Sequence, residues 1–476
     1  MEGLASKGIR IAIEAERLAL ENSIPEEDLL SLQKTLISKE DILHLIEKRR
    51  EEKPPEVRIG RSPDFKPLAA EHSPELEFRD STDVTGKSHT GGTVEDFVSC
   101  FRSRYEKISR LLRSYGSAKY PEADLSHVRS HEGEKVKIIV MVTELSTTKN
   151  GNLLARVEDL TGQWKVVFSA KYEKMFERAK ALVRDDVIAI YGKALDAFLI
   201  AEDFEWPDLP LSREEKRGER DLAAAYISDI HFGSDTFINS QFDAFVDWLN
   251  GNGSNPQLAG KMKYLFVAGD IVDGIGIYPN QEQELTEKDV YKQYGFFDRF
   301  VEQLPDHIEV IVCPGNHDAV RRGEPMPAIS KEIIKSDVHL VGSPSYCSAE
   351  GFEHLVYHGT SVDSWIATVP RLSYDKPERV MEEALKRRHL SPSFGGNAIV
   401  PESLDYMVIE KEPDILHFGH VHKNGYAKYR GTLIINSGTF QATTPFQKKQ
   451  GHIPTPGKVP TFEFKTGQLR TLDFTR

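Results

Sequence analysis

Apolar residues recur at helical spacing through the first fifty positions of the chain. A helix carries every third or fourth residue on one face, so this spacing predicts helices that bury one side. Pro25 and Ser38 suit helix starts. We therefore predict a small all-α domain over residues 1–50, and its simplest interpretation is a docking module without chemistry. The recurring positions are Ile9, Ile13, Leu18, Leu20, Leu29, Leu32, Leu36, Ile42, Leu45 and Ile46.

The next segment, residues 51–92, has no apolar periodicity. It is rich in proline and charge, a composition that buries little apolar surface and predicts a flexible linker. From residue 93 to about 115 the helical spacing returns and predicts an amphipathic helix. Its apolar positions are Phe97, Phe101, Tyr105, Ile108 and Leu112.

Between residues 136 and 204 the pattern becomes that of strands. Three apolar or alternating runs, a helix-like piece at 171–182 and further strands follow within about 70 residues, an order that resembles a β-barrel of the OB-fold type. We assign residues 93–210 to the amphipathic helix plus this OB-fold domain. Residues 133–205 hold 11 Lys/Arg against 12 Asp/Glu. A barrel that gripped DNA alone would be basic, so a structural role stays open beside DNA binding.

The remaining residues, 221–476, alternate strands with helices and form an α/β domain. Each predicted strand ends in polar residues, and ligand sites of such sheets lie at the carboxyl ends of strands. The polar clusters are D-I-H at 229–231, G-D-I-V-D at 269–273, G-N-H-D at 315–318, Y-H-G at 357–359 and G-H-V-H at 419–422.

The overall composition is that of a globular protein. Apolar residues make up 39% and charged residues 28% of the 476 positions, which excludes wholesale disorder. No stretch approaches the roughly 20 apolar residues of a membrane span, and no apolar leader opens the chain, so we expect neither membrane insertion nor secretion. Cys100, Cys313 and Cys347 are widely separated, which favours a reducing compartment and a cytoplasmic location.

The polar clusters have a chemistry in common. Taken singly, each has a structural explanation, such as an aspartate that caps a helix. Five in order after apolar strands predict a metal site, because carboxylates and imidazoles together bind manganese, iron or zinc. Side chains alternate along a strand, so Asp229 and His231 are expected on one face, as are His420 and His422. Glycines at 269, 315, 359 and 419 are expected to let the backbone approach the metals closely.

The series resembles the motifs of the calcineurin-like metallophosphoesterase superfamily over residues 223–440. The resemblance implies two divalent metals that clamp a phosphodiester and activate a water. Manganese is expected, with magnesium, iron(II) and zinc as alternatives. The implied ligands are Asp229, His231, Asp270 and His422 for one metal and Asp270, Asn316, His358 and His420 for the other, with Asp270 bridging. His317 would face the scissile phosphate as the catalytic residue, and Asp318 would orient His317 or its loop, or cap a helix.

The flanking segments narrow the resemblance. GNHDAVRRGEPMPAI, DILHFGHVHKNGYAKYRGTLIINSGTFQATTPFQ and PTPGKVP resemble the small subunit of archaeal family D DNA polymerase. This family implies a 3′→5′ proofreading exonuclease that acts on a DNA primer-template and pairs with a large catalytic subunit. Two alternatives remain: a stand-alone phosphodiesterase or phosphatase, and a scaffold subunit with a vestigial site.

The formal net charge of −13 limits how this chain contacts DNA. Proteins that coat DNA are basic, so contact must be local, metal-assisted or shared with a partner. Arg321, Arg322 and Arg371 are candidates to position the DNA, and so is the basic stretch 386–389, which otherwise is a solvated face. We expect the barrel and residues 447–460 to dock on the large subunit; alternatively, 447–460 is a rigid loop that closes the phosphoesterase domain.

Overall fold

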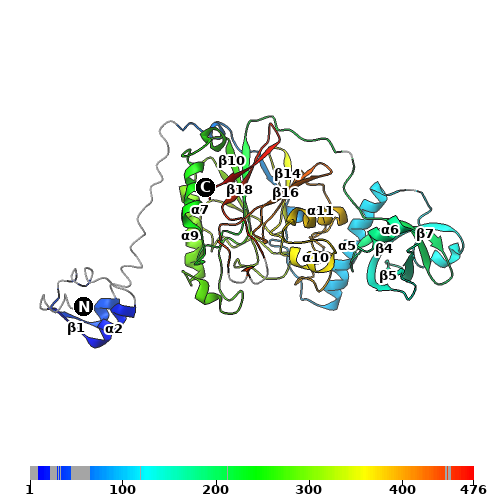
Figure 1. Ribbon diagram of the computed structural model, residues 1–476, viewed down its shortest axis with the longest axis horizontal. Coiled ribbons are helices and arrows are strands. Elements are labelled where there is room, and N and C mark those ends of the chain that lie inside the picture. Colours follow the sequence, from blue (N-terminus) through cyan, green and yellow to red (C-terminus); the bar gives the residue numbers. More distant parts are fainter. Residues whose placement is uncertain are drawn as a thin grey trace. The chain divides into compact units, whose positions relative to one another are not determined.

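The computed structural model describes residues 9–21, 29, 32, 34–43, 65–117, 119–211, 213–444, 447–448 and 452–475. The chain divides into two compact units, Met1–Ile59 and Gly60–Arg476 (Figure 1). The second unit contains the barrel and the two large sheets, and therefore every predicted site residue.

The N-terminal unit is not confirmed as all-α. Its strands β1 (Arg10–Ile11) and β2 (Leu36–Ile37) pair in parallel, and helix α2 (Ile13–Glu21) follows β1. Ile11 and Ile37 are β-branched residues, which favour strands, and the helical spacing of the apolar residues around them did not reveal this preference. Ser38 does start a helical turn, because its hydroxyl accepts the Asp41 N–H at 3.3 Å. Pro25, Leu45 and Ile46 lie outside the described residues.

Residues 65–92, expected to be linker, are part of the second unit. They form the short helices η1 (Leu68–Glu71) and η2 (Asp80–Thr82), and strand β3 (Leu76–Phe78) adds an edge to a sheet by pairing with β13 (Ser345–Ala349). The flexible-linker prediction is wrong here, because backbone pairing across a long sequence separation needs no apolar periodicity. Residues 51–64 lie outside the described residues.

Helix α5 (Val94–Tyr115) confirms the predicted amphipathic helix. Thr93 accepts the Asp96 N–H and Asp96 accepts the Thr93 N–H, so a capping box fixes its start. The buried face of α5 carries Tyr105, Ile108 and Leu112, which pack on strands β4 (Lys135–Thr147) and β7 (Val187–Ala194) of the barrel.

The barrel is closed and five-stranded, with the order β4-β5-β6-β8-β7. Along the chain, helix α6 lies between β6 and β7, where the sequence predicts it. Alternating apolar side chains fill the interior, which explains the closure. The elements are η3 (Val128–His131), β4 (Lys135–Thr147), β5 (Leu153–Glu158), β6 (Gln163–Phe168), α6 (Glu173–Ala179), β7 (Val187–Ala194) and β8 (Leu199–Glu205).

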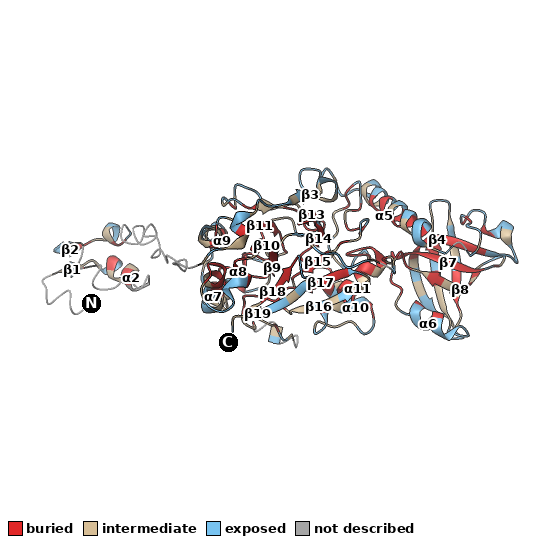
Figure 2. Cartoon of the chain, turned by 90° about the horizontal axis from the view of Figure 1, so that it is seen from above, coloured by how far each residue is buried: buried red, intermediate tan, exposed pale blue. Residues whose placement is uncertain are grey.

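Two six-stranded sheets pack face to face in the C-terminal domain. Their orders are β12-β11-β10-β9-β18-β19 and β16-β17-β15-β14-β13-β3. Figure 2 shows that buried residues concentrate on these strands. The strands are β9 (Ala223–Ile227), β10 (Met262–Ala268), β11 (Glu309–Cys313), β12 (His339–Leu340), β14 (Phe352–Val356), β15 (Ile415–Phe418), β16 (Gly425–Tyr429), β17 (Thr432–Asn436), β18 (Lys458–Glu463) and β19 (Gln468–Asp473).

Helices cover the outer faces of both sheets, so the central strands are buried on both sides (Figure 1). Such strands read as continuous apolar runs rather than alternating ones. Aromatic side chains, including Phe266 and Tyr226, fill the space between the sheets. The helices are α7 (Asn239–Leu249), α8 (Pro256–Ala259), η4 (Gln281–Glu284), α9 (Val290–Gln303), α10 (Val362–Thr368) and α11 (Pro377–Arg387).

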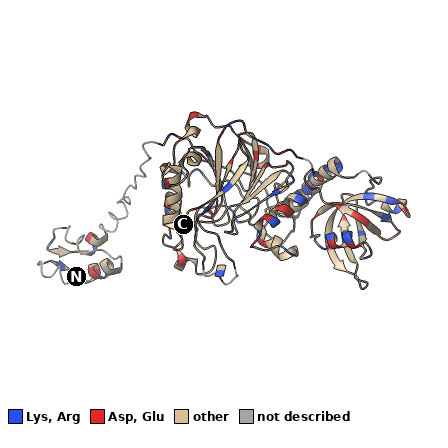
Figure 3. Cartoon of the chain, turned by 45° about the horizontal axis from the view of Figure 1, so that its top comes forward, with Lys and Arg blue, Asp and Glu red and all other residues tan. Residues whose placement is uncertain are grey.

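Buried ion pairs join the barrel and α5 to the C-terminal α/β domain. Arg104 of α5 places Nε 2.7 Å from Asp405 Oδ2, and Arg387 places Nε 3.1 Å from Asp186 Oδ1 at the start of β7. Figure 3 shows the basic positions along α5. The interpretations of residues 386–389 as a solvated face or a phosphate-positioning group are therefore wrong for Arg387 and its neighbours Arg388 and His389, which are buried and paired.

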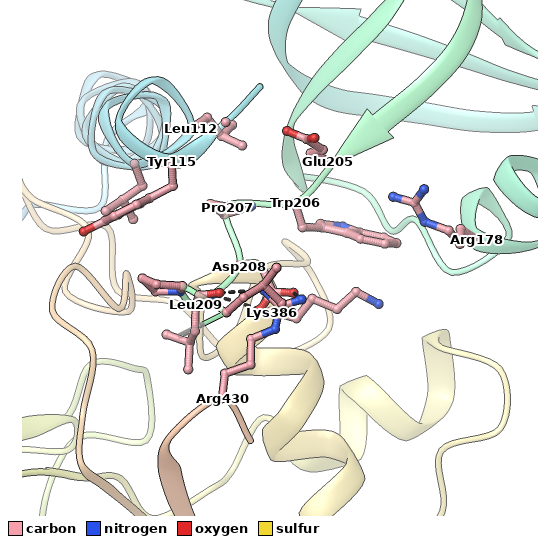
Figure 4. A pocket seen from close by; sticks show the side chains of 14 residues that line it. Leu112, Tyr115, Arg178, Glu205, Trp206, Pro207, Asp208, Leu209, Lys386 and Arg430 are labelled. Carbon is pink, nitrogen blue, oxygen red and sulfur yellow. Dashed lines mark hydrogen bonds and ion pairs between the residues drawn. The ribbon is translucent and has the colours of Figure 1, made fainter. Parts of the chain in front are cut away.

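A cavity of about 620 Å³ lies at the same junction (Figure 4). Leu112 and Tyr115 of α5 line one side, Trp206 and the following connector line another, and Lys386 reaches in from α11. The Lys386 ammonium lies 4.1 Å from the centre of the Trp206 ring, so this basic side chain makes a cation–π contact within the protein.

The C-terminal stretch 452–460 is built into the domain rather than laid on its surface. Lys458 begins β18, which lies between β9 and β19 in the first sheet. The Thr455 N–H donates to the His422 carbonyl at 2.8 Å, and the Gly457 N–H donates to Thr439 at 2.8 Å. The alternative of a segment that closes the C-terminal domain therefore describes residues 455–460, and the expectation that they avoid a central strand is wrong for Lys458 to Pro460. Ile453 is 67% exposed, and docking of this stretch on a partner stays a prediction. Proline at 460 is tolerated because β9 pairs with β18 only from Thr461 to Glu463, so the β9 side of Pro460 carries no ladder.

Among the described residues we find no helix whose length and apolar character would let it cross a membrane.

Candidate metal centre

Each predicted ligand lies in a loop just beyond the carboxyl end of a strand. Strands β9, β10 and β11 run parallel in one sheet, and β14, β15 and β17 run parallel in the other. Their carboxyl ends meet at one edge of the two-sheet core, so residues from five loops converge.

The ligand residues leave the strands in an unusual backbone conformation. Asp229 (φ 51°), His231 (φ 55°), Asp270 (φ 49°), His420 (φ 70°) and His422 (φ 55°) all have left-handed φ. Strands β9 and β15 end before these residues, so the expected alternation along a strand is not what aligns them. Such strain in non-glycine residues clusters at functional sites, because surrounding contacts must enforce it.

One half of the cluster contains Asp229, His231 and His422. His422 Nε2 lies 3.0 Å from His231 Nε2 and 3.4 Å from Asp229 Oδ1. The second oxygen of Asp229 accepts the His420 N–H at 2.9 Å, which ties this half to the other. All three residues are buried.

The other half contains Asp270, Asn316, His358 and His420. His358 Nε2 lies 3.3 Å from Asp270 Oδ2, 3.0 Å from Asn316 Oδ1 and 3.3 Å from His420 Nδ1. Asp270 Oδ2 is also 3.9 Å from His231 Nε2, so this carboxylate lies between the two halves. The structure thus brings together all seven predicted ligands.

These spacings fit metal ligation. Two ligand atoms at about 2.1 Å from one cation lie about 3.0–3.4 Å apart in octahedral or tetrahedral arrangements, and the contacts within each half of the cluster have these separations. The tautomers fit as well. His358 donates Nδ1–H to the Ala268 carbonyl at 2.8 Å, so its Nε2 lone pair faces the cluster. A ring lone pair that faces other acceptors calls for a cation between them.

The electrostatics of the centre favour positive charge. Burial lowers the pKa of His358, but the carboxylates of Asp270 and Asp229 outweigh burial and raise it to about 10. Burial also lowers the pKa of His231, whereas Asp273 and Asp270 raise it to about 9. For Asp270, burial is opposed by His358 and His317, which hold its carboxyl pKa well below the usual range. Bound cations would supply the charge that protons otherwise supply.

His317 lies beside the ligands and is held by two hydrogen bonds. Its backbone N–H donates to Asp270 Oδ1 at 2.8 Å, and its Nδ1 lies 2.8 Å from the Asp273 carbonyl oxygen. Burial lowers the pKa of this imidazole. With Nδ1 engaged, Nε2 is the ring nitrogen left for a substrate. His317 is also near enough to group with His231 and Asp270 as a possible ligand, so its role needs a direct test.

Two of the glycines let the backbone pass close to the proposed bridging carboxylate. A Cβ at Gly315 would lie 2.2 Å from Asp270 Oδ1, and a Cβ at Gly269 (φ 82°) would lie 2.6 Å from the Gly315 nitrogen. Any side chain at either position would displace the central carboxylate or the loop that carries it.

Asp318 fixes the loop that carries Asn316 and His317. Its carboxylate accepts the Gly315 N–H at 2.8 Å, the Ile271 N–H at 3.2 Å and the Tyr294 hydroxyl at 3.0 Å. It therefore joins the loops after β10 and β11, which agrees with the expectation that it orients the His317 loop.

Sequence reasoning missed several residues of the site. Asp273, in the G-D-I-V-D cluster, places Oδ1 3.0 Å from His231 Nδ1, and its motif was the available signal. Asp363 and Gln447 contact the outer nitrogens of His420 and His422, at 3.1 and 2.8 Å, and no motif marks them. A cavity of about 260 Å³ opens onto the centre. Its other walls include Tyr278, Tyr374, Gln441, Thr444 and His452.

The three candidate DNA-positioning arginines do not line this cavity. Arg321 is committed to the protein: it pairs with Glu402 at 2.9 Å and donates to the Pro325 carbonyl. Arg322 is exposed and donates to the Gly276 carbonyl at 2.8 Å. Arg371 is exposed as well and has left-handed φ (74°). Arg322 and Arg371 therefore remain the candidates with accessible side chains.

Comparisons with known proteins agree with this centre. Residues 224–424 match the calcineurin-like phosphoesterase family. The DNA polymerase II small subunit of Archaeoglobus fulgidus is 44% identical over 387 residues, which cover 80% of this chain and 77% of that protein. That of Methanothermobacter thermautotrophicus is 40% identical over 419 residues, 86% of this chain and 85% of that one. That of Methanocaldococcus jannaschii is 38% identical over 397 residues, 81% and 66% of the two chains.

Proposed function

Because this chain belongs to the family of archaeal DNA polymerase II small subunits, we propose that it is the metal-dependent 3′→5′ exonuclease of a heterodimeric family D DNA polymerase. The observation that carries the proposal is the convergence of all seven ligand side chains at metal-ligand spacing around Asp270. A scaffold with a vestigial site would have no need to keep five strained residues converging on one point.

The residues divide between two cations. Asp229, His231 and His422 would hold one, and Asn316, His358 and His420 would hold the other, with Asp270 shared. Two divalent cations bound there would polarise the phosphodiester and lower the pKa of a bound water. Manganese is the proposed metal, because several imidazoles suit it better than magnesium; iron(II) and zinc fit the same donors.

His317 completes the proposed chemistry from the protein side. Its two anchors, to Asp270 and to the Asp273 carbonyl, fix the ring at the edge of the cluster. A phosphodiester held at the centre would meet Nε2, which we assign to stabilising the departing 3′-oxygen. Arg322 and Arg371 would contact the DNA backbone outside the cavity.

The proposed partner is the large catalytic subunit. The small subunit carries a net charge of −13, and phosphate neutralisation by Lys and Arg supplies most non-specific DNA affinity. A proofreading nuclease must stay at the primer end, so the large subunit supplies the grip on the primer-template and this chain supplies the hydrolytic site.

The experiment is degradation of a 5′-labelled primer with manganese, by the chain alone and with the large subunit. Asp270→Ala should abolish cleavage, because both cations lose a shared ligand. Asp375→Ala is the matched control, since Asp375 is 70% exposed and its nearest recorded partner is Lys423 at 3.9 Å. Cleavage by Asp270→Ala at the wild-type rate would refute the assignment. Release of p-nitrophenol from a generic phosphodiester without any DNA cleavage would favour a stand-alone phosphodiesterase.

A further inference from the structure

Asp363 lies on the rim of the metal-centre cavity, outside every motif of the site. It belongs to the first turn of α10, and its side chain is 55% exposed. Its Oδ2 lies 3.1 Å from His420 Nε2. His420 is only partly exposed, at 14% of its side chain, so this surface carboxylate reaches down to a ligand histidine that lines the cavity.

This contact selects one tautomer of His420. An ionised carboxylate can only accept a hydrogen bond, so the contact with Asp363 requires the proton of His420 to be on Nε2. The lone pair is then on Nδ1, which faces His358 Nε2 at 3.3 Å and belongs to the group formed with Asp270. With the other tautomer, an N–H would point into the cluster and His420 could not bind a cation.

The two halves of the centre use the same device from different sources. In the first half, Asp273 Oδ1 lies 3.0 Å from His231 Nδ1, which leaves Nε2 for the cluster. Asp273 comes from the G-D-I-V-D loop itself. In the second half the corresponding carboxylate comes from α10, more than fifty residues before His420 in the chain.

Asp363 is itself held in place. Its Oδ1 accepts the Tyr374 hydroxyl at 2.8 Å, and the Tyr374 ring packs on His452 with ring centres 3.9 Å apart. With one oxygen fixed by Tyr374 and the other directed at His420, the carboxylate has a single orientation. A randomly placed surface aspartate would have no such second anchor.

We propose that Asp363 is a positioning residue that fixes His420 for the second cation, with Tyr374 orienting Asp363. The proposal rests on the proposed function of the same centre. Carboxylates that hold a ligand histidine raise its basicity and its affinity for metal, and their loss typically weakens metal binding by about 10- to 100-fold.

The test measures Mn²⁺ binding to the full chain after removal of metal with a chelator. Asp363→Asn should weaken the binding of one of the two ions by about 10-fold, and Asp363→Ala should weaken it by up to about 100-fold. The affinity for the other ion should not change. Asp363→Glu retains the carboxylate and should recover part of the loss, while Tyr374→Phe should weaken the same ion by less. Asp375→Asn is the matched control and should bind both ions as wild type does. The visible absorption of the Co²⁺-loaded chain gives a second readout of the altered ligand set.

Three results would overturn the proposal. In the first, Asp363→Ala binds both ions with wild-type affinity. In the second, both ions weaken equally together with a large fall in melting temperature, which would make Asp363 a structural residue. In the third, the wild-type chain binds no divalent ion, which would also refute the proposed function. The first two results leave the proposed function intact, so the two failures are distinguishable.

Discussion

Replacing Arg104 by methionine should weaken the attachment of α5 to the phosphoesterase domain. The Arg104 guanidinium is buried, lies 2.7 Å from Asp405 Oδ2 and also donates to the Pro392 carbonyl. Methionine keeps an unbranched apolar stem of similar length, so packing changes little. The substitution therefore isolates the loss of the charged group.

The magnitude follows from what Asp405 retains. Removing one partner of a buried ion pair costs about 3–5 kcal/mol, because the other charge stays buried. Asp405 keeps His389 Nε2 at 3.0 Å and the Met407 N–H at 2.9 Å, so we expect the low end, about 3 kcal/mol. Arg110, on the same helix, is 68% exposed and 3.6 Å from Glu410. Arg110→Met should cost no more than about 1 kcal/mol.

The loss should also depend on pH. Burial raises the pKa of Asp405, but Arg104 and His389 outweigh burial and hold it below its usual range. The wild-type pair therefore stabilises the fold above the unfolded pKa of about 3.9 and loses that contribution as the pH falls through the folded pKa. In the variant, burial has less opposition and the Asp405 pKa rises, so protonation relieves the buried charge. The difference between wild type and variant should shrink from pH 7 towards pH 4.

Guanidinium unfolding of the full chain, followed by fluorescence at both pH values, measures these differences. Both variants replace an arginine of α5 by methionine, so their difference removes the effect of this change on helix propensity and net charge. Equal losses from the two variants, or a loss at Arg104 that does not shrink on acidification, would refute the reasoning.

Two further predictions concern the proposed nuclease. His317→Ala should keep both metals and lose turnover by about 10²-fold, as measured by elemental analysis beside the rate; metal lost in step with activity would instead make His317 a ligand. The isolated chain should bind primer-template with a Kd of about 1 μM or weaker at physiological salt, measured by fluorescence anisotropy, and the large subunit should tighten binding; tight, salt-resistant binding by the isolated chain would contradict the proposed division of labour.

Local hydrophobic periodicity in the sequence was enough to predict many of the helices and strands. The helical spacing from Phe97 to Leu112 predicts α5, because an amphipathic helix is encoded by its own residues. The barrel strands and their intervening helix are likewise visible as runs of fixed period. The N-terminal residues show the limit of this reasoning. Apolar spacing of three or four residues over a short run does not distinguish a helix from the two-residue strands at Arg10–Ile11 and Leu36–Ile37.

The convergence of the polar clusters was predictable for a related reason, whereas the choice of ligands within each cluster came from the resemblance to metallophosphoesterase motifs. Each cluster, from D-I-H at 229–231 to G-H-V-H at 419–422, follows an apolar strand, and parallel strands bring their carboxyl ends to one edge. The sequence therefore determined which polar clusters converge. It did not determine how they are aimed, which depends on left-handed backbone and on hydrogen bonds between loops.

Tertiary structure alone decided the remaining features. The sequence suggests that Arg387 belongs to a basic surface. In the folded chain it is buried and contacts Asp186, which is 201 residues away. The proline-rich C-terminal stretch becomes β18 because β9 and β19 offer their edges to it. Asp363 reaches His420 only once α10 is packed beside β15. Asp186 for Arg387, β9 for β18 and His420 for Asp363 all lie far away in the chain, so no local period or motif records these contacts. They exist only after the sheets and the barrel have assembled.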